Sequence, residues 1–123
     1  MKFYYNGQLV RTSNHAYKFA CLEVRDGKYI TVCCSKTRDG AEKAKNHELS
    51  DCDRIIENVT NAIKAKEAGK KGYYAREGRR TYFLKFDDSF YYELDYMKNK
   101  IESLKERIED VKNNWVIVEL QAK

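Results

Sequence analysis

An apolar stripe near the C-terminal end of the chain constrains the fold most. Between residues 90 and 113, seven apolar side chains recur in unbroken steps of four and three: Phe90, Leu94, Met97, Ile101, Leu104, Ile108 and Val111. This spacing places them on one face of an α-helix, which must be covered by another element or by a second chain. A chain of 123 residues has little other apolar area for a core. We therefore expect the stripe to pack on the chain's own sheet in a protein that is mainly monomeric, with a dimerising seam as the alternative.

Two tight turns predict hairpins in the first third of the chain. Asn6-Gly7 and Asp26-Gly27 are flanked by strand-forming residues, and Asn, Asp and Gly tolerate the positive φ angles of such turns. In the second hairpin, over residues 19–24 and 29–34, alternation divides the side chains between two faces. The more apolar set, which we expect to face the core, is Ala20, Leu22, Val24, Ile30, Val32 and Cys34.

A second amphipathic helix is predicted over residues 50–69. Ser50 and Asp53 resemble a capping box, the apolar residues that follow recur at helical spacing, and Gly69 suits a helix end. A short polar helix is expected before it, over residues 40–48. The long helix of the stripe should begin after Asp87-Asp88-Ser89, which we expect to cap it.

The remaining segments complete the predicted fold class. Strands are expected over residues 80–86 and 115–120, and a loop or loose hairpin over residues 69–78. The order is then β-β-β-β-α-β-α-β. This order predicts an α+β fold in which an antiparallel or mixed sheet of hairpin-linked strands carries two long helices on one face. We expect a single domain over residues 1–123.

Composition argues against a membrane or secreted protein. No apolar run approaches the ~20 residues needed to span a bilayer, and the N-terminal residues lack the apolar core of a signal peptide. We therefore expect a cytoplasmic protein with reduced cysteines and no membrane contact. The net charge is +5, from 24 basic and 19 acidic residues.

All six cysteine and histidine residues lie between residues 15 and 52. Thiolate and imidazole are the ligands that structural zinc prefers, and one such ion stabilises a small domain. Two of the cysteines should share a hairpin face, and a third should lie in the first turn of the helix that starts at Ser50. The predicted zinc ligands are Cys21, Cys33, His47 and Cys52. The alternative is that the cysteines are small core residues and the histidines are surface residues, because no familiar zinc spacing is present.

Residues 64–85 carry a concentrated positive charge, with eight basic and two acidic side chains. Lys and Arg neutralise phosphates while Tyr stacks on bases, and Tyr and Arg are also frequent anchors in protein interfaces. A plain solvated loop is the alternative. The predicted partner-binding residues are Lys70, Lys71, Tyr73, Tyr74, Arg76, Arg79 and Arg80.

Catalytic groupings are missing from the sequence. It contains no Ser/His/Asp set, no phosphate-binding glycine loop and no helical H-x-x-x-H motif. The paired carboxylates Asp51/Asp53 and Asp87/Asp88 are explained by helix starts. The sequence therefore predicts a protein that is not an enzyme.

The first third of the chain contains the segments FYYNGQLVRTS at residues 3–13, YKFA at 17–20, CCS at 33–35 and AEKA at 41–44. Together these segments resemble small proteins encoded by phages and mobile elements of low-GC Gram-positive bacteria. Some proteins of this kind are anti-CRISPR proteins, which inhibit the type II CRISPR nuclease. The resemblance implies a small, non-catalytic protein that occupies a surface of the nuclease, and at least one such inhibitor holds zinc. It assigns no functional residue.

Two main hypotheses follow. The first is a non-enzymatic phage or prophage protein that binds and inhibits a host CRISPR nuclease. Because the chain is positively charged, such an inhibitor should bind an acidic or neutral protein patch, or the nucleic acid, and should not mimic DNA. The alternative is a nucleic-acid-binding accessory module that uses the basic, tyrosine-rich 70–80 loop. A dimeric scaffold built on the last helix is a third possibility.

Overall fold

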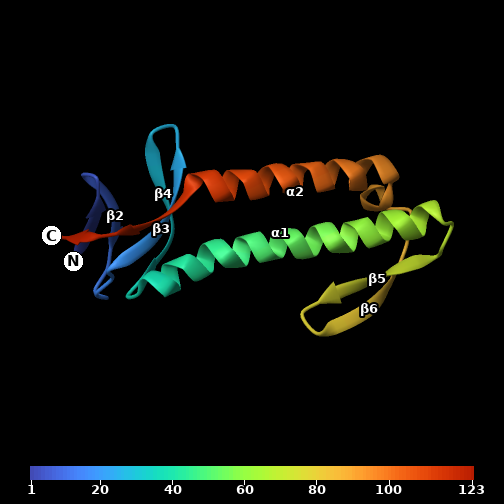
Figure 1. Cartoon of the computed structure of the whole chain (residues 1–123), viewed down its shortest axis with the longest axis horizontal. Helices are drawn as coiled ribbons and strands as arrows, with labels where there is room; N and C mark the ends of the chain where they lie inside the picture. Colours follow the sequence, from blue (N-terminus) through green and yellow to red (C-terminus); the bar gives the residue numbers. More distant parts are fainter. The chain divides into compact units, whose positions relative to one another are not determined.

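The computed structural model describes residues Met1 to Lys123 and has an α+β fold (Figure 1). Eight strands form three antiparallel sheets, and two long helices accompany them. The order of elements follows the predicted scheme, with the 69–78 segment supplying a strand of its own. The chain divides into two compact units, residues 1–49 with 109–123 and residues 50–108. The expectation of a single domain stays a prediction.

The first unit contains two three-stranded sheets. β1 (Lys2–Tyr5) pairs with β2 (Gln8–Thr12) and with the short β8 (Gln121–Ala122). β3 (Phe19–Arg25) lies between β4 (Lys28–Ser35) and β7 (Trp115–Glu119). Asn6 and Asp26 both have positive φ angles and are followed by glycines with positive φ, which confirms the two predicted turns.

The central strand β3 is buried on both faces. On one face, Leu22 packs in a cluster with Phe3 and Val118. On the other face, Cys21 packs with Val111 and Trp115. The second cluster also includes Ala44 and Leu49, so helical segments cover one face of the sheet, as predicted. That face carries Cys21, whereas the predicted core face, with Ala20 and Leu22, packs against residues of the N-terminal hairpin.

A β-bulge corrects the predicted core face of β4. Cys21 pairs with Cys33 but Leu22 pairs with Thr31, so Val32 has no residue opposite it. One extra residue reverses the alternation beyond it. Tyr29 therefore joins the core cluster, while Ile30 and Val32 are exposed. Their predicted place in the core is wrong.

One helix, α1 (Arg38–Glu67), replaces the two that were predicted. Its N-terminus is capped by Thr37, whose Oγ1 accepts a hydrogen bond from the Gly40 N–H at 3.0 Å. Ser50 lies in the interior of α1, so its predicted capping role is wrong. The helix continues through this position because residues 41–68 contain no glycine or proline that would interrupt it. Gly69, with φ of 71°, ends the helix as predicted. The N–H groups of residues 69 and 70 donate to the carbonyls of residues 66 and 65, which closes a Schellman motif.

The apolar stripe forms helix α2 (Leu94–Asn114), which begins later than predicted. A separate 3-10 turn, η1 (Phe90–Tyr92), precedes it, and Ser89 caps that turn. Phe90 is exposed outside the α-helix, whereas Met97 and Val111 are buried. The other four residues of the stripe are only half-buried: Leu94, Ile101, Leu104 and Ile108. In the second unit α2 lies beside α1, and the Lys98 ammonium and Glu67 carboxylate of the two helices form an exposed ion pair at 3.8 Å.

No helix of the chain is long and apolar enough to cross a membrane.

We expect Leu22→Ala to lower the free energy of unfolding by about 2 to 5 kcal/mol, because it leaves a cavity at a fully buried position. Leu104→Ala removes the same atoms from a half-buried position and should cost clearly less. Urea unfolding followed by circular dichroism compares the two. Equal losses of unfolding free energy would show that Leu104 is fully buried in solution. If the unfolding midpoint also rose with protein concentration, Leu104 would be buried against a second copy of the chain.

Candidate partner-binding surface

The predicted partner-binding residues lie on and beside one β-hairpin of the second unit. β5 (Gly72–Glu77) and β6 (Arg80–Lys85) pair around a turn at Gly78-Arg79. In Figure 1 this hairpin lies beside the C-terminal part of α1. A two-stranded sheet is marginally stable alone. Its attachment to α1 therefore decides the geometry of the site.

Asn58 of α1 binds the edge of β5 that is not paired with β6. Its Oδ1 accepts a hydrogen bond from the Arg76 N–H at 2.8 Å, and its Nδ2 donates one to the Arg76 carbonyl at 2.9 Å. The side-chain amide thus pairs with β5 as a neighbouring strand would. Three alanines of the second unit are buried, at positions 62 and 65 of α1 and position 75 of β5. Their small side chains add little bulk to either element.

Tyr73 lies on the inner face of the hairpin. Its ring stacks on Phe86, with ring centroids 5.5 Å apart, and meets Tyr92 edge-on at 6.1 Å. Lys66 places its Nζ 5.1 Å from the centroid of the Phe86 ring. Burial, followed by a hydrogen bond with Tyr92, raises the pKa of Tyr73 to about 12. Tyr73 therefore packs the hairpin, and its hydroxyl stays protonated at neutral pH.

The outer face of the hairpin presents two large aromatic side chains. Tyr74 and Phe83 lie opposite each other in the strand pairing and make an edge-to-face contact, with ring centroids 5.3 Å apart. Their exposed fractions are 64% and 52%. The Phe83 ring lies across Gly72, where an added Cβ would meet Phe83 Cζ at 2.5 Å. Glycine at position 72 therefore lets the ring lie against the strand.

Basic side chains surround this aromatic pair. Arg76 shares the outer face with Tyr74, and a cleft of about 350 Å³ beside the two rings is bordered by Lys64, Lys70 and Lys71. The four basic residues are exposed. We define the hairpin surface by the following residues: Lys64, Lys70, Lys71, Tyr74, Arg76 and Phe83. An adjoining hollow of about 510 Å³ adds Lys66 and Lys85 but also two carboxylates, Asp87 and Asp88.

The hairpin surface differs from the predicted set in five residues, because it adds Lys64 and Phe83 and leaves out Tyr73, Arg79 and Arg80. Arg79 lies in the turn between the two strands. Tyr73 is turned inward, and the strand pairing places Arg80 on the inner face opposite Glu77. Phe83 was missed, although the register of the predicted strand with residues 72–77 would have placed it beside Tyr74.

No protein-family model, curated protein or solved structure matches this chain.

The structure brings together only two of the four predicted zinc ligands. Cys21 and Cys33 lie opposite each other in the β3–β4 pairing. Cys52 lies in the interior of α1, so its predicted place in a first helical turn is wrong, and His47 is about 140° away around the same helix. No group of three or more Cys, His, Asp or Glu side chains is arranged to hold a metal ion.

Burial also acts against the thiolate form that a metal requires. It raises the pKa of Cys21 to about 11, with Cys33 as a second cause, and it raises the pKa of Cys34 in the same direction. None of the four cysteines is in a disulfide. Zinc binding by Cys21, Cys33, His47 and Cys52 stays a prediction that needs a rearrangement of these residues.

Elemental analysis of protein purified without added metal tests that prediction. Zinc binding predicts about one zinc per chain and a lower melting temperature in chelator, because bound structural zinc contributes to folding. Less than about 0.1 zinc per chain, with an unchanged melting temperature, would contradict it.

We expect Asn58→Ala to weaken the attachment of the hairpin. Losing two hydrogen bonds to Arg76 should lower the free energy of unfolding by about 1 to 2 kcal/mol, and the Arg76 amide should exchange faster with deuterium. Asn46→Ala is the matched control, because it makes the same change at an exposed position of the same helix. If both variants had equal stability and equal Arg76 exchange, the attachment would not depend on Asn58.

Proposed function

We propose that this chain is a non-enzymatic protein that binds single-stranded nucleic acid on the hairpin surface. The observation that carries the proposal is the exposed Tyr74–Phe83 pair with basic side chains around it. Exposed aromatic rings stack on bases of any sequence, and Lys and Arg neutralise the phosphates between them. Unpaired bases expose their faces for such stacking, and paired bases in a duplex do not.

The charge of the outer face supports an anionic partner. Strand pairing places Gly72, Tyr74 and Arg76 of β5 on this face, opposite Lys85, Phe83 and Thr81 of β6. None of the six is acidic. The one acidic residue of the two strands, Glu77, falls on the inner face. A phosphate backbone crossing the outer face therefore meets no like charge from the strands themselves.

Inhibition of a host CRISPR nuclease is the second candidate function. The resemblance of residues 3–13 and the shorter segments after them to small phage and mobile-element proteins favours it. In that case the hairpin surface would contact an acidic or neutral patch of the nuclease, and the chain would act in the cytoplasm of the host cell. Salt dependence separates the candidates, because each phosphate contact with a single strand contributes about −0.7 to the log–log slope of affinity against salt.

The charge-reversing double variant Lys70→Glu with Lys71→Glu tests the nucleic-acid proposal. We expect wild-type protein to bind a labelled single strand of about 12 nucleotides, and the variant to bind it about tenfold or more weakly. The salt slope should become shallower by about 0.7 for each lost phosphate contact. The melting temperature should stay nearly unchanged, because both lysines are exposed. Fluorescence anisotropy at several salt concentrations measures affinity and slope together.

Lys28→Glu with Lys36→Glu is the control, because it changes the net charge equally at exposed positions of the other unit. Equal losses in both double variants would mean that net charge alone holds the strand, which contradicts the assignment to the hairpin surface. A wild-type protein that binds no oligonucleotide, but binds a CRISPR nuclease with weak salt dependence, would support the second candidate.

A further inference from the structure

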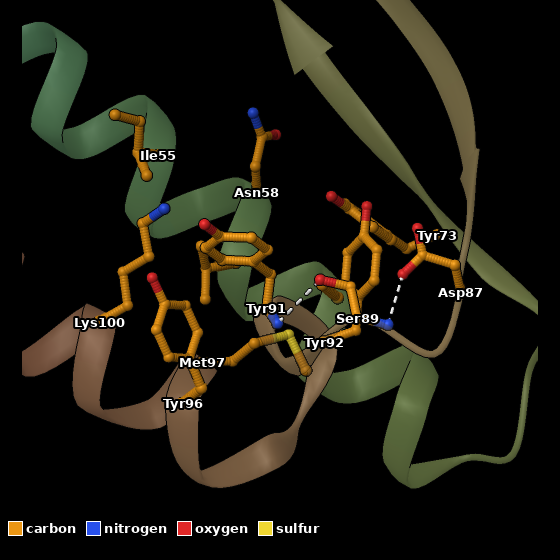
Figure 2. Close-up of a pocket in the computed structure, with 12 residues that line it drawn as sticks. Ile55, Asn58, Tyr73, Asp87, Ser89, Tyr91, Tyr92, Tyr96, Met97 and Lys100 are labelled. Carbon is orange, nitrogen blue, oxygen red and sulfur yellow. Dashed lines mark hydrogen bonds between the residues drawn. The ribbon is translucent and has the colours of Figure 1, made fainter.

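A second cleft, of about 410 Å³, opens between α1, η1 and the start of α2 within the second unit (Figure 2). Four tyrosines contribute to its lining: Tyr73, Tyr91, Tyr92 and Tyr96. Its volume lies in the range of sites that hold small organic molecules. Tyr73 lines both this cleft and the cleft of the hairpin surface, so the two are neighbours.

Tyr91 and Tyr96, which line this cleft, form a group of aromatic rings with Phe90. The ring centroids of Phe90 and Tyr91 are 4.1 Å apart, and the Tyr96 centroid lies 5.2 Å and 5.4 Å from them. Phe90 and Tyr91 are 53% and 56% exposed. Such a patch of apolar ring area on a small protein marks a contact site more often than chance exposure.

Local hydrogen bonds fix the backbone of the turn that carries Tyr91. The Ser89 N–H donates to Asp87 Oδ1 at 2.8 Å, and the Tyr91 N–H donates to Ser89 Oγ at 3.2 Å, as the dashed lines in Figure 2 show. These bonds fix the 3-10 turn that carries Tyr91. A preformed aromatic site binds a flat ligand at a smaller entropic cost than a mobile one.

The charged lining residues of the cleft are one of each sign, Lys100 and Asp87, and the Asp87 carboxylate accepts the hydrogen bond from the Ser89 N–H. Lys100 is the one cationic lining residue, and it is exposed. The Asn58 amide is already engaged by the Arg76 backbone. The ring faces are therefore available for a flat ligand, and the Lys100 ammonium group is the one positive charge in the lining that can meet an anion.

We infer that this cleft binds a single nucleobase together with its phosphate. The base would stack on the Tyr91 ring, to which the Tyr96 ring stands at 83°, with Lys100 near the phosphate. The inference rests on the proposed function and deepens it, because the cleft would hold one unstacked base of a strand that crosses the hairpin surface. Proline-rich peptides also dock on tyrosine-rich grooves. The lysines of the adjoining hairpin surface favour the anionic ligand.

Tyr91→Ala tests the inference, with Tyr91→Phe as the matched control that keeps the ring. We expect Tyr91→Ala to bind the single-stranded oligonucleotide about fivefold or more weakly, which is the lower range for one stacked base, with an unchanged salt slope. Tyr91→Phe should bind like wild type. An abasic strand of the same length should show no difference among the three proteins.

Nucleoside monophosphates test the cleft without the strand. We expect them to shift the NMR signals of the Tyr91 and Tyr96 rings in wild-type protein, and in the Lys70→Glu, Lys71→Glu variant as well. Ring shifts without oligonucleotide binding would support the cleft assignment while the proposed function fails. Equal oligonucleotide binding by Tyr91→Ala and wild type, without ring shifts, would overturn the inference while the proposed function stands. Ring shifts caused by a proline-rich peptide alone would also overturn it.

Discussion

The two hydrogen bonds between the Asn58 side chain and the Arg76 backbone are the contact on which the candidate site depends. A hairpin of two strands has no third strand to hold its outer edge and is marginal by itself. The Asn58 amide supplies one donor and one acceptor at that edge, as a strand would. This attachment leaves Tyr73 on the packed face and Tyr74 on the open face. The exposure of the Tyr74–Phe83 pair is thus a consequence of where the hairpin is attached.

The basic residues near the hairpin also serve the helix that carries it. Lys64 and Lys66 lie in the last turn of α1, where positive charge offsets the negative end of the helix dipole. Lys66 in addition contacts the Phe86 ring on which Tyr73 stacks. Lys70 and Lys71 follow the Schellman turn at Gly69 and lead directly into β5. The end of one helix therefore concentrates charge beside the aromatic pair, and the outer face of β5 and β6 carries no acidic residue.

Local chemistry in the sequence predicted the turns well and the helix starts poorly. Asn6-Gly7, Asp26-Gly27 and Gly69 need positive φ angles, a requirement that depends on the residue alone, and all three predictions are confirmed. Ser50 carries the same local signal as a real cap, but an uninterrupted helix from Thr37 uses its backbone groups instead. Helix propensity alone does not decide whether the helix begins after Thr37 or at Ser50.

Long-range features of the structure could not be predicted from the sequence, for a physical reason. The bulge at Val32 adds one residue to a strand and leaves no compositional mark, yet it exchanges which side chains reach the core. The strand register that joins Tyr74 to Phe83, and the inward turn of Tyr73, also depend on packing between separate elements. The basic and aromatic composition indicated the segment that carries the hairpin surface, whereas the cysteines and histidines that are close in sequence are not brought together in a group of three or more.

Amide chemical-shift mapping of isotope-labelled protein during titration with a single-stranded oligonucleotide tests the central claim most directly. Binding on the hairpin surface predicts that the largest shifts occur at the C-terminal end of α1 and along β5 and β6, with Tyr74 and Phe83 among them. The strands of the first unit should change little. The account would be contradicted by largest shifts on β1 to β4, or by no shifts at low salt, where phosphate contacts are strongest.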